Sequence, residues 1–207
     1  MTFAIDDYVA IRGDLVLEKA TATGGTRAMR DAQTDALLVG ATNVSMFFGA
    51  NAGQASEVGV ALTDGTLGLV IYETADAGSR ETTPYALQAS GTAALVGVSG
   101  VTLTGTMSAR LNRAGKAVDE TITTATGSVQ VLFEGAADVT TVSGSVDIDL
   151  AGFIRLSGNF EVDRATDGTT SKLLVGASDA TAYLGSSDGS MGVRVSDASL
   201  GLVMYRQ

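Results

Sequence analysis

Val142-Ser-Gly-Ser-Val-Asp-Ile-Asp-Leu150 alternates apolar or small residues with polar ones over its whole length. Successive side chains of an extended backbone point to opposite faces, so this period of two predicts a strand with one inward face. Val101–Leu111 follows the same rule, and short Gly, Asn and Ser clusters such as Asn51-Ala-Gly53 separate the runs. Helical spacing is almost absent. The sequence therefore predicts an all-β fold.

The chain also repeats itself. Three blocks recur in the same order without internal gaps, and the differences in length fall between the blocks. The matching pairs are 8–19 with 153–164, 37–49 with 173–185, and 58–72 with 191–205.

The middle of the chain carries a related but distinct pattern. Its recurring element is apolar-x-Gly-polar-apolar. The element occurs around Gly105 and Gly144 in the middle, and around Gly13 and Gly158 in the flanking parts. Glycine inside a strand is costly unless the backbone bends or approaches a neighbour closely, so these glycines predict repeated corners or bulges. We read residues 1–207 as one repeat domain in three parts: half-repeat A (1–78), half-repeat B (79–150) and half-repeat A again (151–207).

A chain that starts and stops at the same phase of a repeat is typical of a segment from a longer tandem array. Stacking of such repeats buries the face of each unit against the next. A β-solenoid or β-prism-like stack fits this pattern best. An antiparallel β-sandwich or barrel remains the alternative, because hairpins give the same alternation.

Composition restricts the partners and the chemistry. The net charge of −10 repels nucleic-acid phosphates and anionic lipids, so neither is an expected partner. No signal peptide or membrane-spanning apolar run is recognisable. The absence of histidine and cysteine excludes Ser/His and Cys/His catalysis and typical zinc sites. We expect no enzyme, and no catalytic, cofactor-binding or metal-binding residue.

The remaining polar residues have simpler explanations. Three lysines (Lys19, Lys116 and Lys172) are expected on the solvated surface, and the Asp147–Asp149 pair on the polar face of a half-buried strand. Calcium stays open as an alternative cofactor, although turn aspartates usually cap their own backbone. The aspartates considered for calcium are Asp6, Asp7, Asp163, Asp167, Asp188 and Asp197.

Threonine rows and aromatic residues receive similar interpretations. The threonines of 102–106 and 121–124 do not recur at matching positions of the A halves, which argues against an ice-binding array. Tyr72 and Tyr205 end equivalent strands and are expected to stack at the edge of the solenoid. The expected core fillers are Met107, Phe133, Phe160 and Tyr183.

Three motifs carry a resemblance: Leu156-Ser-Gly-Asn-Phe-Glu-Val162, Leu173-Leu-Val-Gly-Ala-Ser-Asp-Ala180 and Ala198-Ser-Leu-Gly-Leu-Val203. The chain resembles β-rich tandem repeats of very large, adhesin-like secreted or surface proteins of Gram-negative bacteria. The resemblance implies an extracellular or cell-surface location and a role as a spacer, filament-forming or adhesive module. Expected partners are copies of itself end to end, neighbouring repeats, or a glycan or protein surface. A calcium- or glycan-binding β module is the alternative function.

Overall fold

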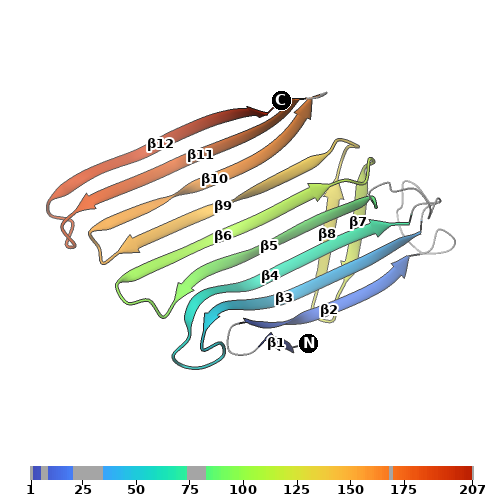
Figure 1. Cartoon of the computed structure of the whole chain (residues 1–207), viewed down its shortest axis with the longest axis horizontal. Helices are drawn as coiled ribbons and strands as arrows, with labels where there is room; N and C mark the ends of the chain where they lie inside the picture. The colour runs from blue at the N-terminus through green and yellow to red at the C-terminus, as the bar shows by residue number, and fades with distance from the viewer. Residues whose placement is uncertain (1, 6–8, 21–34, 74–82, 168–169, 207) are drawn as a thin grey trace.

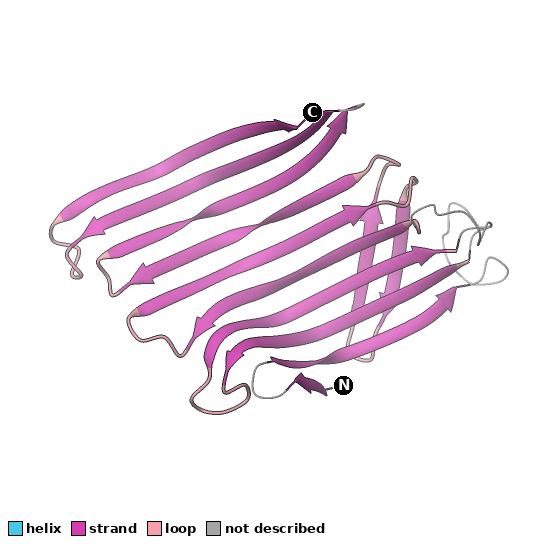
Figure 2. Ribbon diagram, in the orientation of Figure 1, coloured by secondary structure: helices cyan, strands magenta, loops and turns pink. Residues whose placement is uncertain are grey.

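The computed structural model describes residues 2–5, 9–20, 35–73, 83–167 and 170–206. In these ranges the regular structure consists of β-strands, and no helix is found (Figure 2). The strands are β1 (Thr2–Ile5), β2 (Val9–Ala20), β3 (Ala36–Ala50), β4 (Val58–Tyr72), β5 (Tyr85–Val96), β6 (Val101–Asn112), β7 (Val118–Thr123), β8 (Ser128–Phe133), β9 (Val139–Leu150), β10 (Ile154–Asp167), β11 (Thr170–Gly185) and β12 (Gly192–Arg206).

Ten of these strands form one open antiparallel sheet. Its order is β1-β2-β3-β4-β5-β6-β9-β10-β11-β12, so each strand pairs with its neighbour in the chain except where the β7–β8 hairpin intervenes (Figure 1). The hairpin is a separate two-stranded sheet between β6 and β9 in the sequence. The all-β prediction is confirmed.

The described strands do not form the predicted solenoid or prism-like stack. They show neither solenoid rungs nor closure into a barrel, and the second layer is a single hairpin rather than a full sheet. The reason is physical: alternation fixes which side chains share a face, but it does not fix which strand lies alongside. Sequential antiparallel pairing satisfies the same pattern as a solenoid does.

The repeated blocks occupy matching strands. β2, β3 and β4 carry the first set, and β10, β11 and β12 carry the second. Their registers agree, since Leu17 pairs with Val39 in the first set and Val162 with Val175, at the corresponding positions, in the second. The short β1 also lies against β2 as the end of β9 lies against β10.

Two of the recurring glycines mark bulges, as expected. The register between β2 and β3 shifts at Gly13, and the register between β10 and β11 shifts at Gly158. Gly105 and Gly144 instead stay in register. A Cβ on either would collide with the backbone carbonyl of the neighbouring strand, at Ser145 or Thr106. Close approach of backbones, rather than a bend, explains glycine at those two positions.

The best-buried core lies between the hairpin and the sheet. Alternate side chains of β7 and β8 are buried, and the hairpin packs on β3, β4 and β5. Figure 1 shows the hairpin crossing the sheet on one face. The cluster consists of Ala20, Ala36, Leu38, Val70, Tyr72, Ala86, Val118, Ile122, Val131 and Phe133.

Candidate interaction surface

Glycines on the sheet allow the hairpin to approach closely. A Cβ added at Gly40 of β3 would lie 2.6 Å from Ile122 Cγ2, and one added at Gly68 of β4 would lie 2.5 Å from Val131 Cγ2. Both distances are too short for a real side chain. Gly40 and Gly68 therefore form the floor on which the hairpin side chains rest, and we call this surface of β3 and β4 the hairpin seat.

A polar cluster holds the tip of the hairpin to the sheet. The hydroxyl of Thr42 lies 2.6 Å from that of Thr124 and 3.0 Å from that of Thr126. Thr126 donates to Asp14 Oδ2 over 2.8 Å, and Asn43 Nδ2 donates to Thr126 Oγ1 over 2.8 Å. Hydrogen bonds from Thr126 and then from Asn43 hold the pKa of the Asp14 carboxyl below its ordinary value.

The same surface in the second set of strands is uncovered. Leu38, Val70 and Tyr72 are 0%, 0% and 4% exposed, whereas the matching Leu174, Val203 and Tyr205 are 37%, 46% and 68% exposed. Gly176 and Gly201 match Gly40 and Gly68, and a Cβ on either would meet no atom of the described residues within 4 Å. We call these five residues of β11 and β12 the vacant seat.

β12 is also an edge strand. It pairs with β11 alone among the described strands, whereas the matching β4 pairs with β3 on one side and with β5 on the other. An edge strand offers backbone N–H and C=O groups for pairing with a further strand. The vacant seat and this edge adjoin each other on β12.

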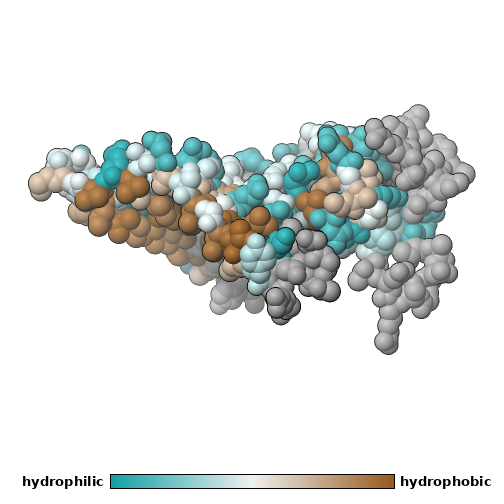
Figure 3. Space-filling view, turned by 90° about the horizontal axis from the view of Figure 1, so that it is seen from above, coloured by the Kyte–Doolittle hydropathy of each residue, from teal (hydrophilic) through white to brown (hydrophobic). Residues whose placement is uncertain are grey.

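The opposite face of the sheet is apolar. The residues that pair across it include Leu15, Ala41, Leu67, Ala89, Ala109, Val142, Val162, Val175 and Leu202. Viewed from the β12 side, hydrophobic residues gather along one side of the molecule and hydrophilic ones along the other (Figure 3). Apolar areas of this extent mark interaction surfaces in soluble proteins.

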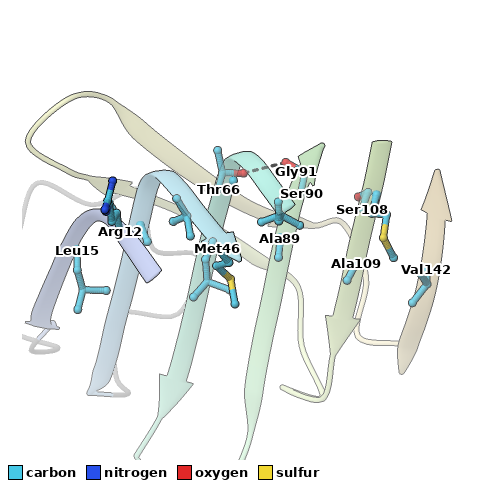
Figure 4. A pocket seen from close by; sticks show the side chains of 17 residues that line it. Arg12, Leu15, Met46, Thr66, Ala89, Ser90, Gly91, Ser108, Ala109 and Val142 are labelled. Atoms are coloured by element: carbon cyan, nitrogen blue, oxygen red, sulfur yellow. Dashed lines mark hydrogen bonds between the residues drawn. The ribbon is translucent and has the colours of Figure 1, made fainter. Parts of the chain in front are cut away.

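A shallow hollow of about 540 Å³ lies on this apolar face. Figure 4 shows its lining side chains, which come from β2, β3, β4, β5, β6 and β9. Thr66 and Ser90 share a hydrogen bond of 2.8 Å at its upper margin, and most of the remaining lining is aliphatic. The hollow thus offers apolar contact area but no arrangement of polar groups that would activate a substrate.

A second hollow of about 460 Å³ lies beside the hairpin and is more polar. Gln88, Arg110, Gln130 and Glu134 contribute to its lining. The Arg110 guanidinium donates to the carbonyl oxygen of Leu132 over 2.9 Å and lies over the Phe133 ring. Arg110 is therefore already used to hold the hairpin against the sheet.

The three lysines expected on the surface contact either carboxylates or tyrosine rings. Lys19 Nζ lies 2.8 Å from Glu73 Oε1 and 3.7 Å from Asp35 Oδ2, and the pKa of Lys19 is raised, first by its hydrogen bond to Glu73. Lys116 and Lys172 lie over the rings of Tyr72 and Tyr205. None of the three is arranged as an activated base.

The aspartates considered for calcium are separated. Asp163 accepts from the Thr141 hydroxyl. Asp149, which belongs to the Asp147–Asp149 pair and not to the calcium candidates, accepts from Gly152 N–H and from Arg155 Nε. Asp188 caps its own turn, and Asp197 stands at a backbone position with φ of 55°. Asp6 and Asp7 lie outside the described residues, as does the side chain of Asp167.

Across the ranges that the structure describes, no three acidic side chains converge on a common metal position. The same ranges contain no helix long and apolar enough to cross a membrane.

The threonine rows do not form a flat array. Thr106 shares a hydrogen bond of 2.8 Å with Ser145 on β9, whereas 121–123 belong to the hairpin and Thr124 bonds to Thr42 at its tip. Phe133 and Tyr183 are buried, as expected of core fillers. Phe160 is half-buried. Met107 is exposed, so its assignment to the core is wrong.

Neither the hairpin seat nor the vacant seat is among the features predicted from the sequence. Their signal is present in the apolar alternation of Val129–Phe133, in Val118 and Ile122 on one face of the preceding strand, and in the match of Gly40 and Gly68 to Gly176 and Gly201 in the repeat alignment. Only the structure shows that one seat is filled and the other is not. Comparison of the chain with protein-family models, with curated proteins and with solved structures finds no match.

Proposed function

We propose that this chain is a non-enzymatic structural repeat segment of a bacterial surface or secreted protein, in which the sheet grows by lateral addition of strands. One observation carries the proposal: among the described strands β12 has a neighbour on one side only, whereas the matching β4 has neighbours on both sides. In this role the chain acts as a spacer or as a filament-forming module. The resemblance of its motifs to repeats of adhesin-like proteins supports the location.

The repeat organisation supports growth along the sheet. Half-repeat A (1–78), half-repeat B (79–150) and the second half-repeat A (151–207) follow one another across the sheet in chain order. The stacking expected from the sequence then takes the form of strand pairing between units, with hairpins as a partial second layer. This replaces the solenoid in the proposal.

The apolar face supports an adhesive contribution. It spans strands of both repeated sets, and the net charge of −10 limits nonspecific contact with other acidic surfaces. A surface of this kind gains free energy when another layer covers it. We propose neighbouring repeats or copies of the chain as its first partners.

Sedimentation and electron microscopy of the purified full chain test the function. We expect concentration-dependent oligomers or filaments. Val195→Lys and Leu200→Lys on β12 should abolish them, because charge on an edge strand opposes strand pairing. The matched control carries Leu184→Lys and Met191→Lys, exposed positions off the edge strand, and should still assemble. Monodisperse monomers of the unmodified chain at every concentration would overturn the proposal.

A further inference from the structure

We propose that the vacant seat, formed by Leu174, Gly176, Gly201, Val203 and Tyr205, is the docking site for the β7–β8-type hairpin of a following half-repeat B. The first strand of that half-repeat pairs with the free edge of β12, as β5 pairs with β4. This inference rests on the proposed function, because it needs the sheet to continue beyond β12. It adds the identity of the partner and the surface that receives it.

The hairpin seat on β3 and β4, which the β7–β8 hairpin fills, shows how a hairpin would dock on the vacant seat. The hairpin leaves the sheet between β6 and β9 and reaches back over β5, β4 and β3. It therefore covers the half-repeat A that precedes it in the chain (Figure 1). A half-repeat B paired with β12 would place its hairpin over β12 and β11 by the same connection.

The floor of the vacant seat has the shape that the hairpin requires. In the filled seat, Ile122 and Val131 pack against the bare backbone of Gly40 and Gly68. Gly176 and Gly201 keep that bare backbone, although none of the residues that the structure describes lies within 4 Å of a Cβ placed on them. An exposed strand position gains nothing from glycine, since a residue with a side chain is more favourable there.

The apolar walls of the seat also match. Leu174 and Val203 stand opposite each other across the β11–β12 pair, as Leu38 and Val70 do across β3–β4. Tyr205 stands at the position of Tyr72 and is the most exposed of these side chains. Their burial by a hairpin would supply the hydrophobic free energy that the filled seat already gains.

The polar partners of the hairpin tip are present as well. Ser178 stands where Thr42 binds Thr124 and Thr126, and Asn159 and Asp179 stand where Asp14 and Asn43 bind Thr126. All three side chains are exposed. The second set of strands thus offers a hydroxyl, an amide and a carboxylate to an arriving hairpin tip.

The five seat residues are identical in the two sets of strands, but two positions beside them change from apolar to charged. Glu161 stands in place of Val16, and Lys172 stands in place of Ala36. Val16 packs against the margin of the hairpin core, and Ala36 pairs with Tyr72 at the end of the strand. The differences fall at the two margins, and the five central positions are apolar or glycine in both seats.

The test lengthens the full chain by one half-repeat. Residues 1–207 are continued with a second copy of 75–150, which restores the spacing between β4 and β5. The chain has no cysteine, so Leu174→Cys provides a single thiol on the vacant seat. We expect the extension to slow thiol labelling at this position by about tenfold or more, as burial beneath a packed hairpin does. Leu38→Cys in the filled seat gives the reference rate.

Two variants separate docking from other effects. Gly176→Val should restore fast labelling in the extended chain, because its Cβ would meet the docked hairpin as one on Gly40 would meet Ile122. Ile122→Asp in the added copy alone should do the same. Hydrogen exchange of the β12 amides reports strand pairing independently of the seat.

The labelling rate and the exchange of the β12 amides together distinguish three outcomes. Protected β12 amides with unchanged labelling overturn hairpin docking but leave the proposed function in place. Unprotected amides with unchanged labelling count against both. Slow labelling of the unextended chain that depends on its concentration identifies a second copy as the occupant and overturns the half-repeat B assignment.

Discussion

Asn159 Nδ2 donates a hydrogen bond to Asp179 Oδ2 over 3.0 Å, and the matching corner of the other repeat makes the same bond with donor and acceptor exchanged. There Asn43 of β3 donates to Asp14 of β2 over 3.3 Å. Both bonds lie beside a shift in register at a strand glycine. The repeat preserves the interaction and its place in the fold, although the side chains have changed strands.

The bulge position occupied by Asp179 is expected to require a residue that tolerates a left-handed backbone. Asn43 and Asp179 have φ values of 51° and 52°, in the left-handed region that β-branched residues avoid. Asp179→Val should therefore lower the free energy of unfolding by about 1–2 kcal/mol more than Asp179→Gly does. Urea unfolding measures both. Ser178→Val, one residue away, should have little effect, and equal losses for Val and Gly at position 179 would contradict the assignment.

The matching glycines Gly40 and Gly176 should differ in how much stability a larger side chain costs. Gly40→Val introduces a side chain against Ile122 and Val16, so it should destabilise the chain by about 1–3 kcal/mol through overpacking. Gly176→Val meets open space and should leave stability unchanged or slightly higher. Urea unfolding of the two full-length variants checks the difference. Equal destabilisation would mean that the second seat is covered within the chain itself.

Ile122 is expected to be the main anchor of the hairpin. It is fully buried and rests on Gly40. Ile122→Ala should lower the free energy of unfolding by about 2–5 kcal/mol, the usual cost of such a truncation in a core. Val193→Ala, on an exposed position of β12, is the control and should change it little. A small effect of Ile122→Ala in urea unfolding would show that the hairpin does not contribute to the core.

The strands themselves could be predicted from sequence. The block 58–72 coincides with β4, and its partner 191–205 falls within one residue of β12, because alternation and turn residues are local signals. Gly13 and Gly158 were also correctly expected at bulges.

Pairing and burial could not be predicted in the same way. Tyr72 and Tyr205 end matching strands in similar sequence, yet one is buried and the other exposed. The difference arises from the hairpin 118–133, which lies far from both in sequence and covers only one of them. Met107 was assigned to the core for the same reason: alternation identifies a face but does not show what covers it.

The turn at Asp188 is expected to lose order in acid. Its carboxylate accepts from the Ser186 hydroxyl over 2.6 Å and from the Ser190 N–H and hydroxyl over 3.0 and 2.8 Å. These hydrogen bonds, first that of Ser186, lower the pKa of Asp188 from 3.8 to about 2. Because the folded pKa lies below the unfolded one, the stabilisation is present above about pH 4 and is lost as the pH falls through about 2.

Nuclear magnetic resonance titration of the Asp188 carboxyl carbon, with amide exchange of Ser190, measures this directly. Exchange at Ser190 should accelerate as the pH falls through that interval, beyond the change in its intrinsic rate. Ser186→Ala should raise the pKa of Asp188 toward 3.8 and move the transition to higher pH, because it removes the strongest donor. Asp188→Asn should abolish the pH dependence. If the pKa of Asp188 is the same in the Ser186→Ala variant as in the unmodified chain, the Ser186 hydroxyl is not the group that stabilises the Asp188 carboxylate.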